Sequence, residues 1–164
     1  MSINFSSDEI FEIAEQIERN GAVFYRKAAE MFSEEAVRGI ILNLAVMEEC
    51  HEKIFASMRT ELKAGDIARM TFDPDNQAVL YLQAAADGKV FDLESDPADK
   101  LPEKASLNDV LDYAIGIEKE SVVFYTGMKE VVPENLGKSK IDGIIKEEIG
   151  HIIELRAQKD SLKQ

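Results

Sequence analysis

The chain has 164 residues, of which 45% are hydrophobic and 31% are charged. This length is typical of one domain whose core is large enough to fold without a staple. The 32 acidic and 19 basic side chains give a formal charge of -13, which argues against nucleic acid as a partner, because a phosphate backbone binds to basic surfaces. The only cysteine, Cys50, excludes internal disulfides, zinc ribbons and a rubredoxin-type four-cysteine centre.

The sequence also predicts where the protein resides. Residues 1–11 lack both the basic start and the apolar run of a signal peptide. No stretch approaches the roughly 18 consecutive apolar residues of a membrane span. A lone cysteine suits a reducing compartment. We therefore expect a soluble cytoplasmic protein without a membrane partner.

Apolar residues spaced three and four apart predict two long amphipathic helices in the first part of the chain. The first covers residues 11–32, and Ser6 with Glu9 predicts a capping box at its start. The second covers about 34–64 and is expected to end at Gly65, because glycine commonly follows the last turn of a helix. A crossover over 65–105 follows, with a short helix expected at about 76–86.

Two more helices are expected after the crossover. The third starts at Ser106 and runs to about residue 132, where Pro133 interrupts it. The fourth runs from about Leu136 to near the C-terminus. Because four long helices occur without a strand pattern, we predict an all-α four-helix bundle in a single domain over residues 1–164, in which a long crossover joins two helical hairpins.

The most informative feature of the sequence is a self-match without gaps at an offset of 100 residues. Amphipathic helices align apolar residues by chance, but chance does not account for both histidines and the matched glutamates falling in one register. The chain is therefore predicted to contain two copies of a hairpin, over residues 1–64 and 106–164. The residues of the first copy that recur 100 positions later include Ala14, Ile17, Glu18, Val23, Phe24, Tyr25, Ile41, Glu48 and His51.

The repeat predicts that four glutamates lie in one layer of the bundle. An antiparallel hairpin places residues that are equally distant from its turn at the same height. Glu18 and Glu48 are each fifteen residues from position 33, and Glu118 and Glu148 are each fifteen residues from Pro133. Their apolar neighbours at three, four and seven residues indicate that all four glutamates point inward.

Four buried carboxylates need positive charge beside them. Without it, their burial would cost more than the marginal stability of a protein, about 5–15 kcal/mol. No lysine or arginine lies in the apolar stripes at that height, whereas His51 and His151 lie one turn from Glu48 and Glu148, and a neutral histidine is a metal ligand. Two divalent cations would balance the four carboxylates. An oxygen-rich ligand set with one imidazole per metal favours iron or manganese, with zinc or cobalt as substitutes.

At these residues the sequence resembles the ferritin-like di-iron carboxylate superfamily, and within it the rubrerythrin-like proteins. The pattern of that superfamily is one glutamate from each of two helices and Glu-x-x-His from each of the other two. The resemblance covers the two hairpins, about three-quarters of the chain. It implies two iron ions as cofactor, bridged by Glu48 and Glu148. The six implied metal ligands are Glu18, Glu48, His51, Glu118, Glu148 and His151.

The resemblance also implies an activity, which is that of a non-haem di-iron oxidoreductase that reduces peroxide or dioxygen with electrons from a separate donor protein. It further implies a homodimer. In rubrerythrin-like proteins, tyrosines at the positions of Tyr25 and Tyr125 hydrogen-bond to carboxylates across the bundle. Core packing is the other interpretation of these two side chains.

Two features depart from typical rubrerythrins. The glutamate expected three residues after the third-helix ligand is Ser121, and the rubredoxin module is absent. Two alternative functions therefore stay open. The first is a ferroxidase or iron-handling protein. The second is a binding module that metals brace without turnover, which Ser121 favours.

The residues next to the ligands in sequence are expected to have other roles. Cys50 is predicted to be a buried or partly buried thiol. Glu49, Glu120 and Glu147 are predicted to be solvated charges, because successive helical residues do not share a face. Glu52, four residues after Glu48, is the one extra carboxylate expected to approach the metals.

Overall fold

The computed structural model describes residues 7–62, 80–82 and 105–162, and these contain long helices and no strand. The long helices are α1 (Ser7–Glu30), α2 (Glu35–Thr60), α4 (Leu107–Val131) and α5 (Lys138–Ser161). A single 3-10 turn, η2 (Glu134–Leu136), lies between α4 and α5. Residues 80–82 are helical as well. The predicted all-α bundle is confirmed.

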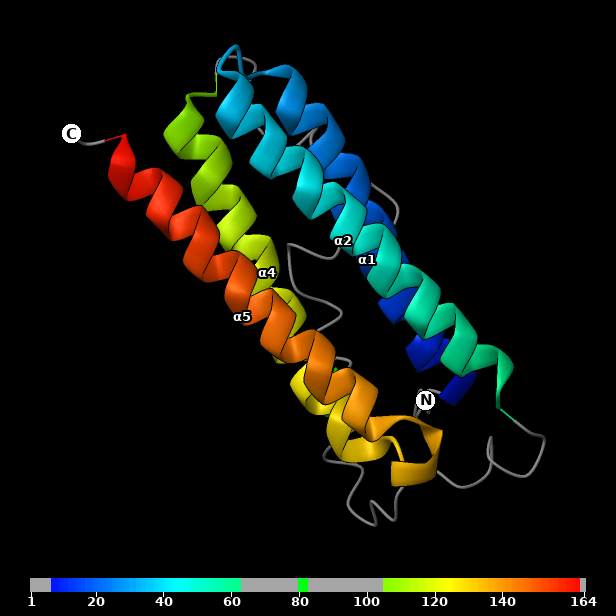
Figure 1. Cartoon of the computed structure of the whole chain (residues 1–164). Coiled ribbons are helices and arrows are strands. Elements are labelled where there is room, and N and C mark those ends of the chain that lie inside the picture. The colour runs from blue at the N-terminus through cyan, green and yellow to red at the C-terminus, as the bar shows by residue number, and fades with distance from the viewer. Residues whose placement is uncertain (1–6, 63–79, 83–104, 163–164) are drawn as a thin grey trace.

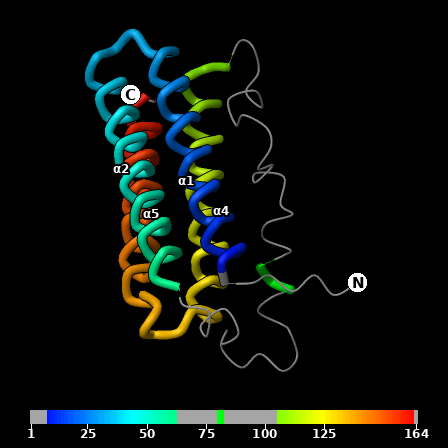
Figure 2. The backbone as a smooth tube through the Cα atoms, turned by 90° about the vertical axis from the view of Figure 1, so that its right-hand side faces the viewer, coloured from blue at the N-terminus to red at the C-terminus, as the bar shows by residue number. Residues whose placement is uncertain are grey.

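The helices form two antiparallel hairpins that pack against each other. The closest packing is between α1 and α2 and between α4 and α5, and across the bundle α1 contacts α4 while α2 contacts α5 (Figure 1). The turn between α1 and α2 lies at one end of the bundle, and the segment between α4 and α5 lies at the other end (Figure 2). The two halves of the chain are therefore related by an approximate two-fold axis across the bundle, as the sequence repeat requires.

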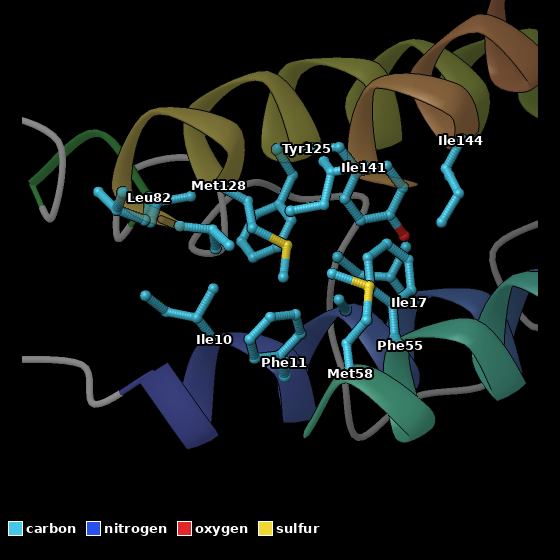
Figure 3. Packing of buried hydrophobic residues seen from close by; sticks show 14 of the residues in the cluster. Ile10, Phe11, Ile17, Phe55, Met58, Leu82, Tyr125, Met128, Ile141 and Ile144 are labelled. Atoms are coloured by element: carbon cyan, nitrogen blue, oxygen red, sulfur yellow. The ribbon is translucent and has the colours of Figure 1, made fainter. Parts of the chain in front are cut away.

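The apolar interior consists of two clusters, one toward each end of the bundle. The first is built around Phe11, Phe55, Met58 and Met128, and Figure 3 shows side chains from both hairpins pointing toward one another there. The second is built around residues near the other end, among them Phe24, Leu44, Leu111 and Leu155. Burial of side chains of this size contributes about 1.5–3 kcal/mol each to folding. The middle of the bundle, between the clusters, contains the buried polar side chains.

The start of α4 and the end of α2 illustrate how the helix limits arise. Ser106 accepts a hydrogen bond from the Asp109 amide, and the Asp109 carboxylate accepts one from the Ser106 amide, which completes a capping box at the predicted start. By contrast, α2 was expected to reach residue 64 and ends at Thr60. The amide of Glu61 bonds to the carbonyls of Ser57 and Met58, and this shared bond tightens the last turn before the helix ends.

The limits of the last helix also differ from the prediction. The fourth helix was expected from about Leu136, but Leu136 belongs to η2, and α5 begins at Lys138. Gly137 separates the two with a φ of 99°, a left-handed conformation that only glycine adopts without strain. A Cβ at Gly137 would also lie 2.8 Å from the Cε of Met58, so the end of that side chain would have to shift as well.

Residues 80–82 pack against the body of the bundle. Leu82 is fully buried in the cluster around Phe11, and the Tyr81 hydroxyl donates a 3.0 Å hydrogen bond to the Val123 carbonyl of α4. A Cβ at Gly127 would lie 2.4 Å from the Cε1 of Tyr81. The absence of a side chain at Gly127 therefore lets this segment lie directly on α4.

Several expectations lie outside the described residues. They are the Ser6 part of the first capping box, the helix stop at Gly65, and most of the 65–105 crossover with the remainder of its short helix. Among the helices that the structure describes, none has the length and apolar character needed to cross a membrane.

Candidate metal centre

All six predicted ligands are buried at the middle of the bundle, and none of them belongs to either apolar cluster. Three come from each hairpin, on α1, α2, α4 and α5. Their exposed fractions are 0% for Glu18, 5% for Glu48, 1% for His51, 1% for Glu118, 0% for Glu148 and 3% for His151. The alignment by equal distance from the turns therefore correctly predicted which carboxylates come together.

The donor atoms of these side chains form two overlapping groups, and in each group the donor atoms lie within 4.8 Å of one another. One group contains Glu18 and His51, the other contains Glu118 and His151, and Glu48 and Glu148 belong to both. Each group thus has its own glutamate and its own histidine, and the two groups have two carboxylates in common. This arrangement suits two neighbouring metal ions.

Both histidines direct the same ring atom into this cluster. The Nδ1 of His51 lies 2.9 Å from the Oε1 of Glu148 and 3.5 Å from the Oε2 of Glu18. The Nδ1 of His151 lies 2.8 Å from Glu148 Oε2 and 3.5 Å from Glu118 Oε2. The two rings are stacked with their centroids 5.9 Å apart. The two imidazoles therefore lie beside each other in the cluster and point toward the carboxylates, and neither ring points toward solvent.

Two tyrosines hold the outer carboxylates from opposite ends of the bundle. The hydroxyl of Tyr25 on α1 donates a hydrogen bond to Glu118 on α4, and the hydroxyl of Tyr125 on α4 donates one to Glu18 on α1. Each tyrosine is fully buried in a different apolar cluster. These side chains therefore pack in the core and also fix the glutamates, so the two interpretations left open by the sequence both apply.

Burial changes the ionisation of the carboxylates in the metal-free protein. It raises the pKa of Glu18 and of Glu48 well above the ordinary value, and repulsion from the neighbouring carboxylates adds to the rise. Burial also raises the pKa of Glu118 to about 8, although its contact with His151 acts in the opposite direction. Without cations, these glutamates therefore retain protons near neutral pH.

Glu148 and the histidines show the opposite balance. Burial would raise the pKa of Glu148, but the contacts with His151 and His51 outweigh it and lower the value to about 2. Burial would lower the histidine values, but the adjacent carboxylates raise the pKa of His51 to about 9 and that of His151 to about 10. Protons on the imidazoles thus provide the positive charge that Glu148 needs when no metal is bound.

Several donor atoms in the cluster have no hydrogen-bond partner. Buried polar atoms normally have one, so a set of unpaired atoms facing a common point indicates a bound group. The atoms that face the cluster without a hydrogen bond are Glu18 Oε2, Glu48 Oε1, His51 Nδ1 and Glu148 Oε1. The last two lie 2.9 Å apart as an ion pair but do not form a hydrogen bond. Oxygen donors with one imidazole per position suit iron or manganese. The residues therefore fit a pair of divalent cations, and the cluster is compatible with a dimetal site.

Gly21 is a residue of the site that sequence reasoning missed. It lies one turn after Glu18 on α1, and a Cβ there would lie 3.2 Å from Glu48 Oε2 and 3.3 Å from Glu48 Cδ. The small residue allows the Glu48 carboxylate to lie against α1. A glycine on the apolar face of a long helix, one turn from a candidate ligand, is the signal that could have identified it.

Two neighbours of the ligands differ from their predicted positions. Glu52 does not approach the cluster, because it accepts a 2.9 Å hydrogen bond from Arg19 near the surface. Cys50 is exposed rather than buried, since it lies two residues after Glu48, about 200° around the helix. Glu147 is half-exposed, as expected of a solvated charge, yet its Oε2 lies 2.8 Å from the Nε2 of His51. The sequence did not predict this last contact.

Comparisons with known proteins support the fold. No protein-family model matches the sequence, and no curated protein matches it by sequence. Among solved structures, a protein from Thermotoga maritima that is described as a "putative ferritin-like diiron-carboxylate protein" superposes with a TM-score of 0.67. The two sequences are 24% identical, and the match covers 95% of each chain. The chain therefore has the ferritin-like fold, and its centre is a buried cluster of glutamates and histidines suited to a pair of metal ions.

Proposed function

We propose that the protein is a di-iron oxidoreductase of the rubrerythrin type, which reduces peroxide or dioxygen at the cluster. The observation that carries the proposal is the pair of overlapping donor groups that share Glu48 and Glu148. In the proposed roles, these two glutamates would be shared by both metals, Glu18 and His51 would hold one metal, and Glu118 and His151 would hold the other. The structural neighbour described as a diiron-carboxylate protein supports iron as the metal.

The chemistry that two reduced irons supply is a pair of electrons delivered together to an oxygen–oxygen bond. The protein supplies the surroundings. Four carboxylates balance the charge of two divalent cations, and the tyrosine hydroxyls of Tyr25 and Tyr125 hold the outer glutamates in place. The apolar clusters above and below the layer exclude water from it. The Nδ1 atoms of both histidines face inward, as ligation requires.

The test is anaerobic loading with Fe(II), followed by addition of peroxide. We expect about two irons per chain, in line with one metal per donor group, and oxidation of both when peroxide is added. Failure to bind iron, or bound iron that peroxide does not oxidise, would remove the proposal. Glu18→Ala and Glu118→Ala, which each delete one outer carboxylate, are expected to reduce the bound iron to about one per chain.

A ferroxidase or iron-handling role is separated from this proposal by the fate of the oxidised iron. With excess Fe(II) and dioxygen, an oxidoreductase retains about two irons per chain, whereas an iron-storing protein accumulates mineral. Ultracentrifugation followed by iron analysis distinguishes the two outcomes.

A metal-braced binding module is the second candidate function, and Ser121 is the observation that favours it. This side chain is buried, with an exposed fraction of 4%, at the position where rubrerythrins have a further carboxylate. A brace would show a higher melting temperature with metal and no consumption of NADH in an assay that supplies a reductase and rubredoxin. Repeated NADH consumption on addition of peroxide would favour the oxidoreductase.

The partners in this proposal are a separate electron donor protein and a second copy of the chain. On α5, Ile149 and Ile153 lie one turn apart and are 44% and 65% exposed, so together they form an apolar face on this helix. A homodimer that covers this face would explain their exposure. Sedimentation equilibrium measures the mass directly, and Ile153→Glu is expected to yield monomer if this face is the interface.

A further inference from the structure

The outer nitrogen of His51 is held by a carboxylate from the opposite hairpin. Its Nε2 lies 2.8 Å from the Oε2 of Glu147 on α5, while its Nδ1 faces Glu18 and Glu148. Both ring nitrogens face carboxylates, but a neutral imidazole carries only one proton. A cation held at Nδ1 would leave that proton on Nε2, where Glu147 accepts it. The contact with Glu147 therefore leaves the lone pair of Nδ1 directed into the cluster, which is the form that binds a metal.

His151 lacks the corresponding contact. Its Nε2 is buried and has no hydrogen-bond partner among the described residues, although its Nδ1 faces the cluster as that of His51 does. The 100-residue repeat explains the difference, because the position equivalent to Glu147 in the first copy is Met47. A thioether is only a weak acceptor. Both histidines thus direct Nδ1 at glutamates of the cluster, but only His51 has a carboxylate at Nε2.

We propose that Glu147 is a positioning residue for His51 and that it makes the two metal positions unequal. This inference rests on the proposed metal site. A carboxylate on the outer nitrogen fixes the ring and makes the inner nitrogen a stronger ligand, and loss of such a partner typically costs 10–100-fold in metal affinity. The position formed with Glu18 and His51 therefore binds its metal more tightly than the position formed with Glu118 and His151, and it fills first.

The location of Glu147 makes it suitable for substitution. Its side chain is 54% exposed, and it lines a surface cavity of about 430 Å³ between α2 and α5, beside Lys53, Ser57 and Ile144. A smaller side chain there enlarges an existing cavity and leaves no closed void in the core. The fold is therefore expected to tolerate changes at this position.

The test is a titration of the metal-free protein with Zn²⁺ against a chelator of known affinity, which gives two stepwise dissociation constants. We expect unequal steps in the wild type. Glu147→Ala should weaken the tighter step by about 10–100-fold and leave the other step unchanged. Glu147→Gln, which keeps an oxygen acceptor without the charge, should weaken it less. Glu154→Ala is the matched control, since it removes an exposed glutamate from the same helix and should change neither step.

A second measurement reports on the ring itself. In ¹⁵N-labelled, Zn²⁺-loaded protein, the Nε2 proton of His51 should be protected from exchange with solvent, and Glu147→Ala should abolish this protection. Equal affinities in the wild type, or a Glu147→Ala variant that changes both steps alike or neither, would overturn the inference. Wild-type protein that binds no metal would instead remove the proposed function, so the two failures are distinguishable.

Discussion

The hydrogen bond from Tyr125 to Glu18 joins two fully buried groups from different hairpins. Tyr125→Phe removes the donor and leaves the carboxyl of Glu18 buried without it. We expect the free energy of unfolding of the metal-free protein to fall by about 1–2 kcal/mol. The buried carboxyl would have lost its contacts with water on folding without a hydrogen bond from the protein to replace them. Urea denaturation measures the change.

A surface tyrosine provides the control for this prediction. Tyr81 is 43% exposed, and its hydroxyl bonds to the Val123 carbonyl. Water can replace the hydroxyl there, so Tyr81→Phe should cost clearly less than Tyr125→Phe. Equal losses of unfolding free energy for the two variants would show that the buried hydrogen bond stabilises the protein no more than the exposed one.

A second prediction concerns the substitution of Gly21. Gly21→Ala adds a Cβ at 3.2–3.3 Å from the Glu48 side chain, which must shift by a few tenths of an ångström. Alanine favours a helix over glycine by about 0.5–1 kcal/mol. We therefore expect the metal-free variant to be at least as stable as the wild type, while its affinity for both metals falls, because Glu48 belongs to both donor groups.

The matched control for Gly21→Ala is Gly116→Ala, since a Cβ at Gly116 on α4 meets no atom within 4 Å. This variant should raise the melting temperature and leave metal affinity unchanged. Calorimetric titration with Mn²⁺ checks both variants. Unchanged affinity in Gly21→Ala would mean that Glu48 does not need its close approach to α1.

Single residues show how far sequence reasoning reaches. Glu18 and Glu148 were predicted to point inward because periodicity defines the face of a helix and distance from the turn defines height. Contacts between side chains on different helices depend on rotamers and on the rotation of each helix, which periodicity does not determine. For this reason the Glu147 contact with His51 and the pairing of Glu52 with Arg19 could not be predicted.

At the scale of elements, Gly127 determines how the segment at 80–82 lies on α4. Gly127→Ala places a Cβ 2.4 Å from the Cε1 of Tyr81, so the segment or the ring must move. We expect a net loss of about 1–3 kcal/mol in the free energy of unfolding, because this overpacking outweighs the gain in helix propensity. Urea denaturation of the variant gives the value.

A double-mutant cycle identifies the cause of this loss. In a Tyr81→Ala background the added methyl group meets no ring, so Gly127→Ala should there be neutral or stabilising. If the penalty persists in that background, the clash with Tyr81 is not its source, and the packing of the segment on α4 has been misjudged.

The ends of a helix could be predicted from the sequence where a particular side chain begins or stops the helix. The Ser106 cap and Pro133 gave the start and the end of α4. Where the backbone sets the limit, prediction was less accurate. Gly137 at the start of α5 and the tightened last turn of α2 depend on dihedral angles and on the nearby Met58, which are properties of the packed hairpins.

For the whole molecule, the ionisation of the cluster predicts how stability depends on pH without metal. Glu118 has a pKa of about 8, and those of Glu18 and Glu48 are also raised, so the folded protein keeps protons that the unfolded chain releases above about 4.5. The histidine pKa values of about 9 and 10 act in the same direction above 6.5. Since the folded state binds more protons in this range, its stability falls as pH rises.

We therefore expect the melting temperature of chelator-treated protein to decrease by several degrees between pH 5.5 and pH 9. Glu148, with a pKa of about 2, acts in the opposite direction only below about pH 4.5. Differential scanning calorimetry over this range tests the prediction, and a melting temperature that rises with pH would contradict it.

The metal-loaded protein is the internal comparison. Metals bind the deprotonated ligands, so loading releases the retained protons, and metal affinity rises with pH. The difference in melting temperature between loaded and metal-free protein should therefore widen from pH 5.5 to pH 9. A constant difference would indicate metal binding away from the cluster.

The fold class was predictable from the apolar periodicity of four long helices, and the position of the centre was predictable from the internal repeat. Two matched Glu-x-x-His motifs such as Glu48 to His51 define the ligand helices, and the equal spacing from the turns defines one layer. The repeat carries no information where the copies differ. The features that needed the structure, such as Gly21 and Glu147, occur at positions where the other copy has a different residue, Ser121 and Met47 respectively.

The two turns at opposite ends of the bundle have a consequence for the origin of the centre. Each hairpin contributes one glutamate and one Glu-x-x-His motif, so a half-length ancestor that paired with its own copy would already have carried the complete set of donors. Such a pair would have been symmetric by necessity, and any substitution would have appeared twice. Fusion of the two copies into one chain would have allowed each half to change alone, and Met47 and Glu147 are a pair of equivalent positions at which the halves differ.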